Sequence, residues 1–347
     1  MPFCRHQCDY CAFATWTDRD HLIEQYMGAC RAHAERLAPG LASVGTVFVG
    51  GGTPSRVAPD LLLAVPAALP VAADAEVTVE CNPEDLDEAR AHAYAAGGVT
   101  RISLGVQSLV PHVLAALGRQ HPREAVAPAV AAARSAGLDV NLDVIYGGAG
   151  ESVADWTTTV EGVLALEPDH VSAYALTVEG GTPLARDRAR HPADDDQADK
   201  YEVVARRLEA AGFEWYEISN WARPGHRCRH NLLYWSMGEY VAIGCAAHGH
   251  RDGVRSWTYP KIESYVRAVE EGRDPVAGSE RLDPDQRVLE GLQLSLRTEA
   301  GVPAAALAPD DRAVVADLVE DDGDRLVLTR AGRLLANEVA MRLRVPL

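Results

Sequence analysis

Three cysteines near the start of the chain are spaced in a pattern that can hold a metal cluster. Cys4, Cys8 and Cys11 follow one another as C-x3-C-x2-C. Thiolates are the protein ligands that iron–sulfur clusters use. Three thiolates leave one iron of a four-iron cluster without a protein ligand. The spacing therefore favours a cluster that contacts a small molecule over one that only carries electrons.

Other interpretations of these cysteines stay open at this point. Zinc needs four ligands and is usually held by a second cysteine or histidine pair, and His6 lies awkwardly inside the loop. A disulfide, or no role at all, are the remaining alternatives. The other four cysteines show no disulfide framework, so we expect small buried apolar residues in a reduced, cytoplasmic protein; they are Cys30, Cys81, Cys228 and Cys245.

Length and charge limit the class of protein. A chain of 347 residues suggests one large domain and one smaller domain. Lys and Arg total 33 against 50 Asp and Glu, a net charge of −17. Such a surface repels nucleic acid and anionic lipid, so neither is expected as a partner. No apolar run is long enough for a membrane span, and no secretory signal is visible.

Strand-like and helix-like segments alternate through the first two thirds of the chain. Short β-branched runs predict strands at 44–49, 76–80, 101–106, 138–146, 170–176 and 213–218. Amphipathic patterns predict helices at 18–37, 84–96, 111–117, 123–136, 153–166 and 194–211. This alternation indicates an α/β fold of parallel strands joined by right-handed crossovers, in an open sheet or a barrel.

The pattern changes from about residue 260 onward. Helices are predicted at 261–271, 283–296 and 310–318, then a strand at 325–328 and a last helix at 329–343. Helices followed by a short hairpin are typical of a small winged-helix-like domain. It lacks a basic recognition face, so we expect it to contact a protein or a ligand rather than DNA.

Polar and glycine residues gather where the predicted strands end, which is where α/β folds bind ligands. The glycine-rich stretch 50–53 could cradle a carboxylate, although it could equally be a turn. Glu80 could neutralise an ammonium group, Arg119 a carboxylate, and Asp143 could accept from a ribose hydroxyl. Gln107 offers a further hydrogen bond. Each has a purely structural alternative, but together they describe S-adenosylmethionine (SAM) beside a cluster with an open iron.

The stretch 230–235 is the other unusual segment, with the sequence H-N-L-L-Y-W. Imidazole is a common ligand of haem iron, and Tyr234 and Trp235 could pack on a porphyrin face. The alternative is an aromatic core segment in which His230 is hydrogen-bonded. His248 and His250 form a pair with no further metal ligand evident, so we assign them no site.

The chain closely resembles the radical SAM superfamily, and within it the oxygen-independent coproporphyrinogen oxidases and their HemW-type haem-chaperone relatives. The matching stretches follow the family's order: 2–13, 48–55, 80–83, 101–108, 117–121, 141–147, 216–220 and 230–235. The resemblance implies a partial (β/α) barrel of parallel strands at 1–255, and a small C-terminal helical, winged-helix-like domain of the HemN type at 256–347.

The resemblance also implies roles by position. Cys4, Cys8 and Cys11 would bind the [4Fe-4S] cluster, and His230 would bind haem. The residues that match family contacts to SAM are Tyr10, Gly51, Gly52, Thr53, Glu80, Gln107, Arg119 and Asp143.

The resemblance favours a haem chaperone that passes haem to an acceptor protein. In the oxidase branch another cysteine follows the third after one residue, whereas Ala12 and Phe13 stand here, as in the chaperone branch except that Ala12 replaces a common acidic residue. The alternative is oxidative decarboxylation of coproporphyrinogen III to protoporphyrinogen IX, and a third class is a zinc-stabilised scaffold. The oligomeric state, including a homodimer, is left open.

The family usually begins with a strand upstream of the cysteine loop, whereas this sequence begins at Met1. We therefore expect either a start further upstream or a missing first strand, which would weaken SAM binding and expose a sheet edge.

Overall fold

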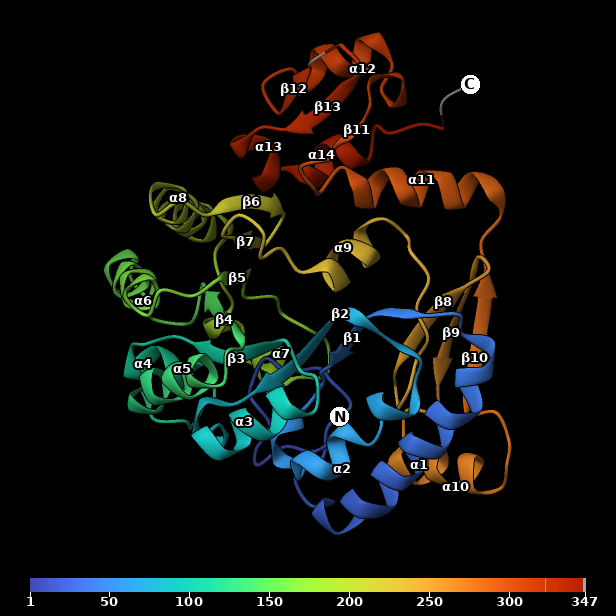
Figure 1. The fold of residues 1–347 in the computed structure, drawn as a ribbon. Helices are drawn as coiled ribbons and strands as arrows, with labels where there is room; N and C mark the ends of the chain where they lie inside the picture. The colour runs from blue at the N-terminus through green and yellow to red at the C-terminus, as the bar shows by residue number, and fades with distance from the viewer. Residues whose placement is uncertain (322, 346–347) are drawn as a thin grey trace.

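A curled seven-stranded sheet forms the centre of the molecule (Figure 1). The computed structural model describes residues 1–321 and 323–345. Five strands run parallel, each beside the one that precedes it in the chain. They are β1 (Val44–Val49), β2 (Val71–Cys81), β3 (Arg101–Gln107), β4 (Asp139–Tyr146) and β5 (His170–Ala175). The apolar, β-branched residues of β3 and β4 are buried, whereas those of β1, at the edge of the sheet, are only partly buried.

Strands that add in chain order with right-handed crossovers place all connecting helices on one face, so the sheet curls into part of a barrel. Figure 1 shows these helices outside the sheet. They are α1 (Ile23–Leu37), α2 (Pro59–Leu63), α3 (Glu88–Ala96), α4 (Pro111–Ala116), α5 (Val126–Ser135), α6 (Val153–Ala165) and α8 (Asp194–Ala210), whereas the short α7 (Pro183–Arg186) contacts the loop of residues 4–11. The predicted α/β partial barrel is confirmed, and the strand order decides between open sheet and barrel.

The last two strands of this sheet depart from the parallel pattern. The predicted strand at 213–218 is present as β6 (Glu214–Glu217). An unpredicted strand, β7 (Asn220–Ala222), turns back and lies antiparallel between β5 and β6. Three residues are too few for a periodic pattern, which is why the sequence did not predict β7. The sheet therefore has edges at β1 and β6 and does not close on itself.

The short helix α9 (Arg229–Trp235) bridges these two edges. Nδ1 of its His230 lies 2.9 Å from Oγ1 of Thr46 on β1. The side-chain amide of its Asn231 donates to Glu217 on β6 at 3.0 Å. The helix thus spans the opening of the half-barrel (Figure 1).

A second, antiparallel sheet follows α9. It consists of β8 (His248–Arg251), β9 (Val254–Thr258) and β10 (Val276–Arg281), in the order β10-β9-β8. The sequence did not predict it, because β10 is largely exposed and lacks an apolar face. The helix α10 (Ile262–Glu270) then packs against α1. The expected domain boundary between residues 255 and 256 falls inside β9, and the division itself stays a prediction.

The C-terminal segment has a core of its own. Its apolar residues, from Leu292 to Leu343, form a cluster separate from the core of the half-barrel. The antiparallel pair β12–β13 provides the expected hairpin, with β11 on the other side of β13. The elements are α11 (Pro284–Ser295), β11 (Val302–Pro303), α12 (Pro309–Val314), β12 (Val319–Asp321), β13 (Arg325–Leu328), α13 (Arg330–Leu334) and α14 (Ala336–Ala340). Among the described residues, every helix is too short or too polar to cross a bilayer.

Candidate functional site

The loop of the three cysteines is fixed in place by backbone bonds to distant segments. The Asp9 N–H donates to the Leu117 carbonyl at 3.2 Å, and the Leu184 N–H donates to the Asp9 carbonyl at 2.9 Å. The Arg190 guanidinium pairs with the Asp9 carboxylate at 2.7 Å. These contacts join the loop to the ends of α4 and α7. The loop is therefore tied to distant segments of the chain.

The glycine-rich stretch after β1 lies directly against this loop. Gly51 has φ of +113°, a conformation that favours glycine. A Cβ on Gly52 would lie 2.9 Å from Sγ of Cys4, so only glycine allows this approach. The Thr53 hydroxyl donates to the same sulfur at 3.6 Å. The sequence assigned this stretch to ligand binding or to a turn, and the structure brings it against the first cysteine.

The three thiols share a small, mostly buried volume. Cys4 and Cys8 are buried, Cys11 is half-buried, and all seven cysteines of the chain are free. Burial raises the pKa of Cys4 and of Cys11, and the neighbouring Cys8 raises both further. Three thiolates at this spacing suit an iron–sulfur cluster, whose metal charge stabilises the deprotonated sulfurs. The donor set therefore fits the cluster.

Arg119 connects the cysteine loop to the strand ends. Nη1 of its guanidinium approaches Sγ of Cys8 at 3.6 Å, while Nη2 donates to Asn82 Oδ1 at 3.0 Å and to the Gly105 carbonyl at 2.8 Å. Its buried Nε has no hydrogen-bond partner among the described residues. Gln107 follows a β-bulge and has φ of +61°, which turns its side chain away from the regular strand direction. Arg119 thus presents an unused donor beside the cysteine loop.

Two carboxylates lie on β2 and β4, the strands on either side of β3. Glu80 accepts from the Gly51 N–H at 2.9 Å, and burial together with Asp143 raises the pKa of Glu80 to about 7. Asp143 accepts from the Ser103 hydroxyl at 2.6 Å and from the Asn141 amide at 2.9 Å. Burial also raises the pKa of Asp143. Both carboxylates line one cavity of about 60 Å³. A cationic or hydroxyl-bearing ligand would relieve this crowding of negative charge.

Tyr10 lies on the other side of the cysteine loop, where its ring packs on the apolar cluster that includes Val113, Leu117 and Leu184. The structure therefore links the residues expected at the cluster and at SAM through a series of contacts. Thr53 reaches Cys4, Arg119 reaches Cys8, and Gly51 reaches Glu80.

His230 lies on α9, on the open side of the half-barrel. Its Nδ1 faces Thr46, and its Nε2 lies 2.8 Å from the Tyr234 hydroxyl. The ring stacks on Phe48 with centroids 5.4 Å apart. Burial lowers the pKa of His230, so the imidazole is neutral at pH 7. Phe48 and Asn231 line the cavity that contains Glu80, which puts α9 next to the strand-end carboxylates.

Two buried glutamates that hold α9 were not singled out from the sequence. Glu76 on β2 accepts from the Arg229 N–H at 2.9 Å and from the His230 N–H at 3.0 Å, so a tertiary carboxylate caps the helix. Glu217 accepts from Asn231, and burial raises the pKa of Glu217 to about 7. Glu76 lies in the alternating strand pattern, and Glu217 lies within the matched stretch 216–220. Only those local patterns could have pointed to them.

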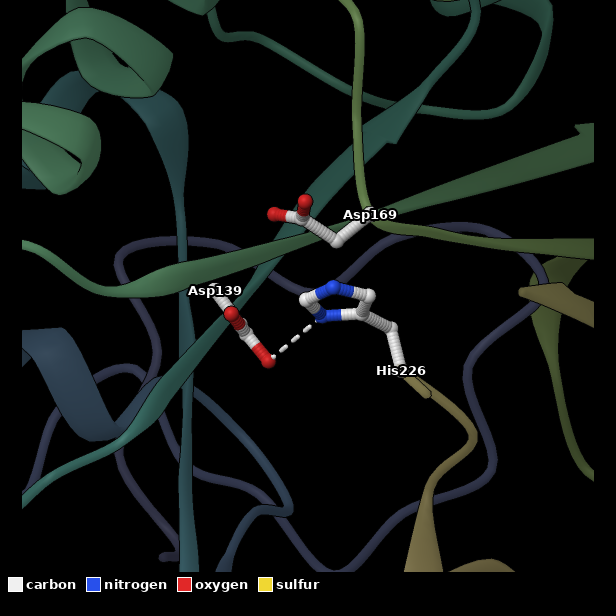
Figure 2. Close-up of side chains that lie close together, drawn as sticks. All are labelled: Asp139, Asp169 and His226. Atoms are coloured by element: carbon white, nitrogen blue, oxygen red, sulfur yellow. Dashed lines mark hydrogen bonds and ion pairs between the residues drawn. The ribbon is translucent and has the colours of Figure 1, made fainter. Parts of the chain in front are cut away.

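A separate group of ligand-type side chains lies at the opposite ends of the strands. Figure 2 shows Asp139, Asp169 and His226 pointing toward one another. Nδ1 of His226 already bonds Asp139 at 3.0 Å, and Asp169 accepts from the Val140 N–H at 2.9 Å. The Arg101 guanidinium lies 3.8 Å from Asp139 and opposes a further cation. We therefore interpret this group as a structural tie for the loop before α9.

Known proteins resemble this chain in sequence along nearly its whole length. Residues 1–162 match the family model described as the Radical SAM superfamily. Two curated relatives are named heme chaperone HemW. The one from Mycobacterium tuberculosis H37Rv is 44% identical, covering 99% of this chain and 93% of its own. The one from Escherichia coli K12 is 32% identical, covering 98% and 95%.

A solved structure has the same fold over nearly the whole chain. Coproporphyrinogen III oxidase (HemN) from Escherichia coli superposes with a TM-score of 0.86 at 21% identity. The match covers 98% of this chain and 88% of that one. At this identity the likeness establishes the architecture, including the small C-terminal part, and not the reaction.

Proposed function

The chain belongs to the radical SAM superfamily and, within it, to the family of HemW heme chaperones, and we propose that it binds haem and transfers it to an acceptor protein. The observation that carries this proposal is the likeness to relatives of that name along nearly the full chain. His230 on α9 also supports the proposal, because a neutral imidazole is the form that can coordinate haem iron. The free state of all seven cysteines is consistent with a reducing compartment, so we place the protein in the cytoplasm.

We infer that Cys4, Cys8 and Cys11 hold a [4Fe-4S] cluster, with SAM beside it. Arg119 would pair with the SAM carboxylate, Glu80 with its ammonium, and Asp143 with a ribose hydroxyl. The ligand would approach the backbone at Gly51, Gly52 and Thr53. The side chains of Gln107 and Tyr10 would form walls of the site. When bound, these groups supply one-electron chemistry. The role of the protein is to fix their orientation and to exclude water from the strand ends.

Haem is the cargo in this proposal, and His230 is the candidate ligand of its iron. A neutral imidazole coordinates through one nitrogen while the other keeps a hydrogen bond that fixes the ring. Thr46 supplies that bond at Nδ1, which leaves Nε2 for the iron. The Tyr234 hydroxyl, now 2.8 Å from Nε2, has to move away as the iron binds. His230 therefore has one anchored and one exchangeable nitrogen.

The test is a haem titration of anaerobically reconstituted protein, followed by the Soret band. We expect saturation near one haem per chain, and binding about tenfold or more weaker in His230→Ala, because the iron loses its protein ligand. His92→Ala is the matched control, since this histidine lies exposed on α3. Metal analysis of the same samples distinguishes iron from zinc in the cysteine loop.

Each alternative has its own outcome in this design. Equal haem binding in wild type and His230→Ala would support the chaperone function but show that His230 is not the ligand of the iron. Failure of the wild type to bind haem would contradict the proposal. Turnover of coproporphyrinogen III under SAM and reductant would then establish the oxidase reaction instead.

A further inference from the structure

A surface groove lies beyond the C-terminal end of α9, apart from the cavity at the strand ends. Its volume is about 610 Å³. The loop after α9, the turn between β8 and β9, the end of β10 and the first turns of α11 form its walls. The lining residues are Met237, Gly253, Arg281, Leu282, Pro284, Arg287, Val288 and Gly291. A groove of this size is large enough for a ligand of cofactor dimensions.

Two guanidinium groups in this groove lack acidic partners. Arg281 donates to the Asp252 carbonyl at 2.9 Å, and among the described residues neither Arg281 nor Arg287 forms an ion pair. Nearby Arg255, in contrast, pairs with Glu280 at 3.0 Å and with Glu290 at 2.6 Å. Two cations left open in a chain of net charge −17 mark a local site for an anion.

Met237 supports an apolar ligand in the same place. It has φ of +53°, and it ends α9 in a Schellman arrangement, in which the Gly238 N–H donates to the Leu233 carbonyl at 2.8 Å. Glycine is the usual residue at this left-handed position, so a methionine there is strained. Its Sδ lies 3.2 Å from where a Cβ on Gly291 would sit, which directs the thioether into the groove. The exposed Val288 continues this apolar surface.

We propose that this groove binds the carboxylate edge of the tetrapyrrole. The two propionates pair with Arg281 and Arg287, and the apolar ring edge lies on Met237 and Val288. The inference rests on the proposed function and adds a second contact to it. His230 is in the first turn of α9 and the groove begins at Met237, beyond the other end of the helix, about 10 Å away at the helical rise per residue. One macrocycle can span that separation, with its iron toward one end and its propionates toward the other.

The first test uses two probes that separate the iron from the carboxylates. Haem is titrated by the Soret band, and metal-free protoporphyrin IX by fluorescence, both on the reconstituted full chain. We expect the double variant Arg281→Glu/Arg287→Glu to bind both probes about tenfold or more weakly, because two charge-assisted bonds become repulsions. Arg267→Glu is the matched control, an exposed arginine on α10 outside the groove. Protoporphyrin dimethyl ester should bind wild type and double variant alike.

A second variant separates binding from folding. Met237→Gly relieves the left-handed strain, so its thermal stability should stay equal or rise while both probes bind more weakly. Glu167→Gly is its control, because Glu167 follows α6 with φ of +52° and lies away from the groove. It should gain stability and keep probe binding unchanged.

The outcomes also distinguish this inference from the proposed function. If wild type binds haem, and the charge-reversal variant binds both probes as wild type does, the assignment of the groove to the propionates is wrong and the proposed haem-chaperone function is unaffected. Failure of metal-free protoporphyrin to bind wild type overturns the groove as well. If wild type binds no haem, the proposed function fails, and the groove assignment fails with it.

Discussion

At the scale of single residues, the strand-end cavity keeps two carboxylates close together. Burial and Asp143 raise the pKa of Glu80 to about 7. A carboxylate with a raised pKa favours folding in its protonated form. Its contribution is therefore complete below the ordinary pKa near 4.5 and is lost as the pH rises through about 7. A bound cation at Glu80 would reverse this cost.

Glu80→Gln should remove that pH dependence. We expect the free energy of unfolding of the cofactor-free protein to fall less steeply between pH 5 and pH 7.5, and to exceed that of wild type by about 2 kcal/mol at pH 8. Urea unfolding across the pH range measures it. Glu88→Gln on the exposed face of α3 is the control. A variant with the same slope as wild type would show that Glu80 ionises normally.

At the scale of elements, α9 depends on other parts of the chain. It has seven residues, and its N-cap Cys228 makes no side-chain cap. A helix this short does not form on its own sequence preference. Glu76 accepts two of its first N–H groups and also lies 3.5 Å from Arg101. The element that carries His230 is thus held by a carboxylate from β2.

Glu76→Ala should loosen α9 and weaken haem binding together. The substitution leaves two helix N–H groups and the buried Arg101 without this acceptor, at a cost of about 3 kcal/mol in unfolding free energy. Glu76→Gln should lose less, because an amide oxygen still accepts. Asp74→Ala, an exposed position on the same strand, is the control. Denaturant unfolding and Soret titration measure the two effects, and unchanged haem affinity in Glu76→Ala would separate α9 from binding.

At the scale of the whole molecule, a few side chains join the C-terminal core to the half-barrel. The Arg333 guanidinium lies 3.6 Å from the centre of the Trp215 ring, and Arg330 pairs with Glu209 on α8. Arg227 joins Glu214 on β6 to Glu299 beyond α11. These contacts hold the C-terminal core, and α11 with it, against the half-barrel. Because α11 forms one wall of the groove, the same contacts also shape the proposed binding site.

Arg333→Ala should reduce the cooperativity of the two cores. Loss of the stacked cation costs about 1–2 kcal/mol, and Arg333→Lys should recover only part, because an ammonium does not stack as a planar group does. Thermal unfolding followed by Trp fluorescence and by circular dichroism measures whether the transitions still coincide. Arg342→Ala, whose pairing is confined to Glu338 within α14, is the control. Coincident transitions at the wild-type temperature would show that this contact does not couple the cores.

Local sequence patterns were enough to predict the parallel strands of the sheet and the helices between them. Strands such as β3 and β4 have buried apolar residues at alternate positions, and the helices beside them have clear periodicity, so both were predicted to within a few residues. β7 is too short for a pattern, and β10 is exposed on both faces, so these strands escaped detection. Because β9 was not predicted either, the expected domain boundary between residues 255 and 256 falls inside that strand.

The sequence by itself determined the chemistry that lies within one loop, because the cysteine spacing and the glycine stretch are short-range features. It also ordered the strand ends, since parallel strands bring their carboxyl ends to one edge. Only the tertiary structure decided what α9 does. The partner of His230 lies on β1, 184 residues away in the chain, whereas that of Asn231 lies on β6, 14 residues away. The two edges face each other only once the half-barrel has curled. Such pairings depend on sheet curvature, which no local pattern encodes.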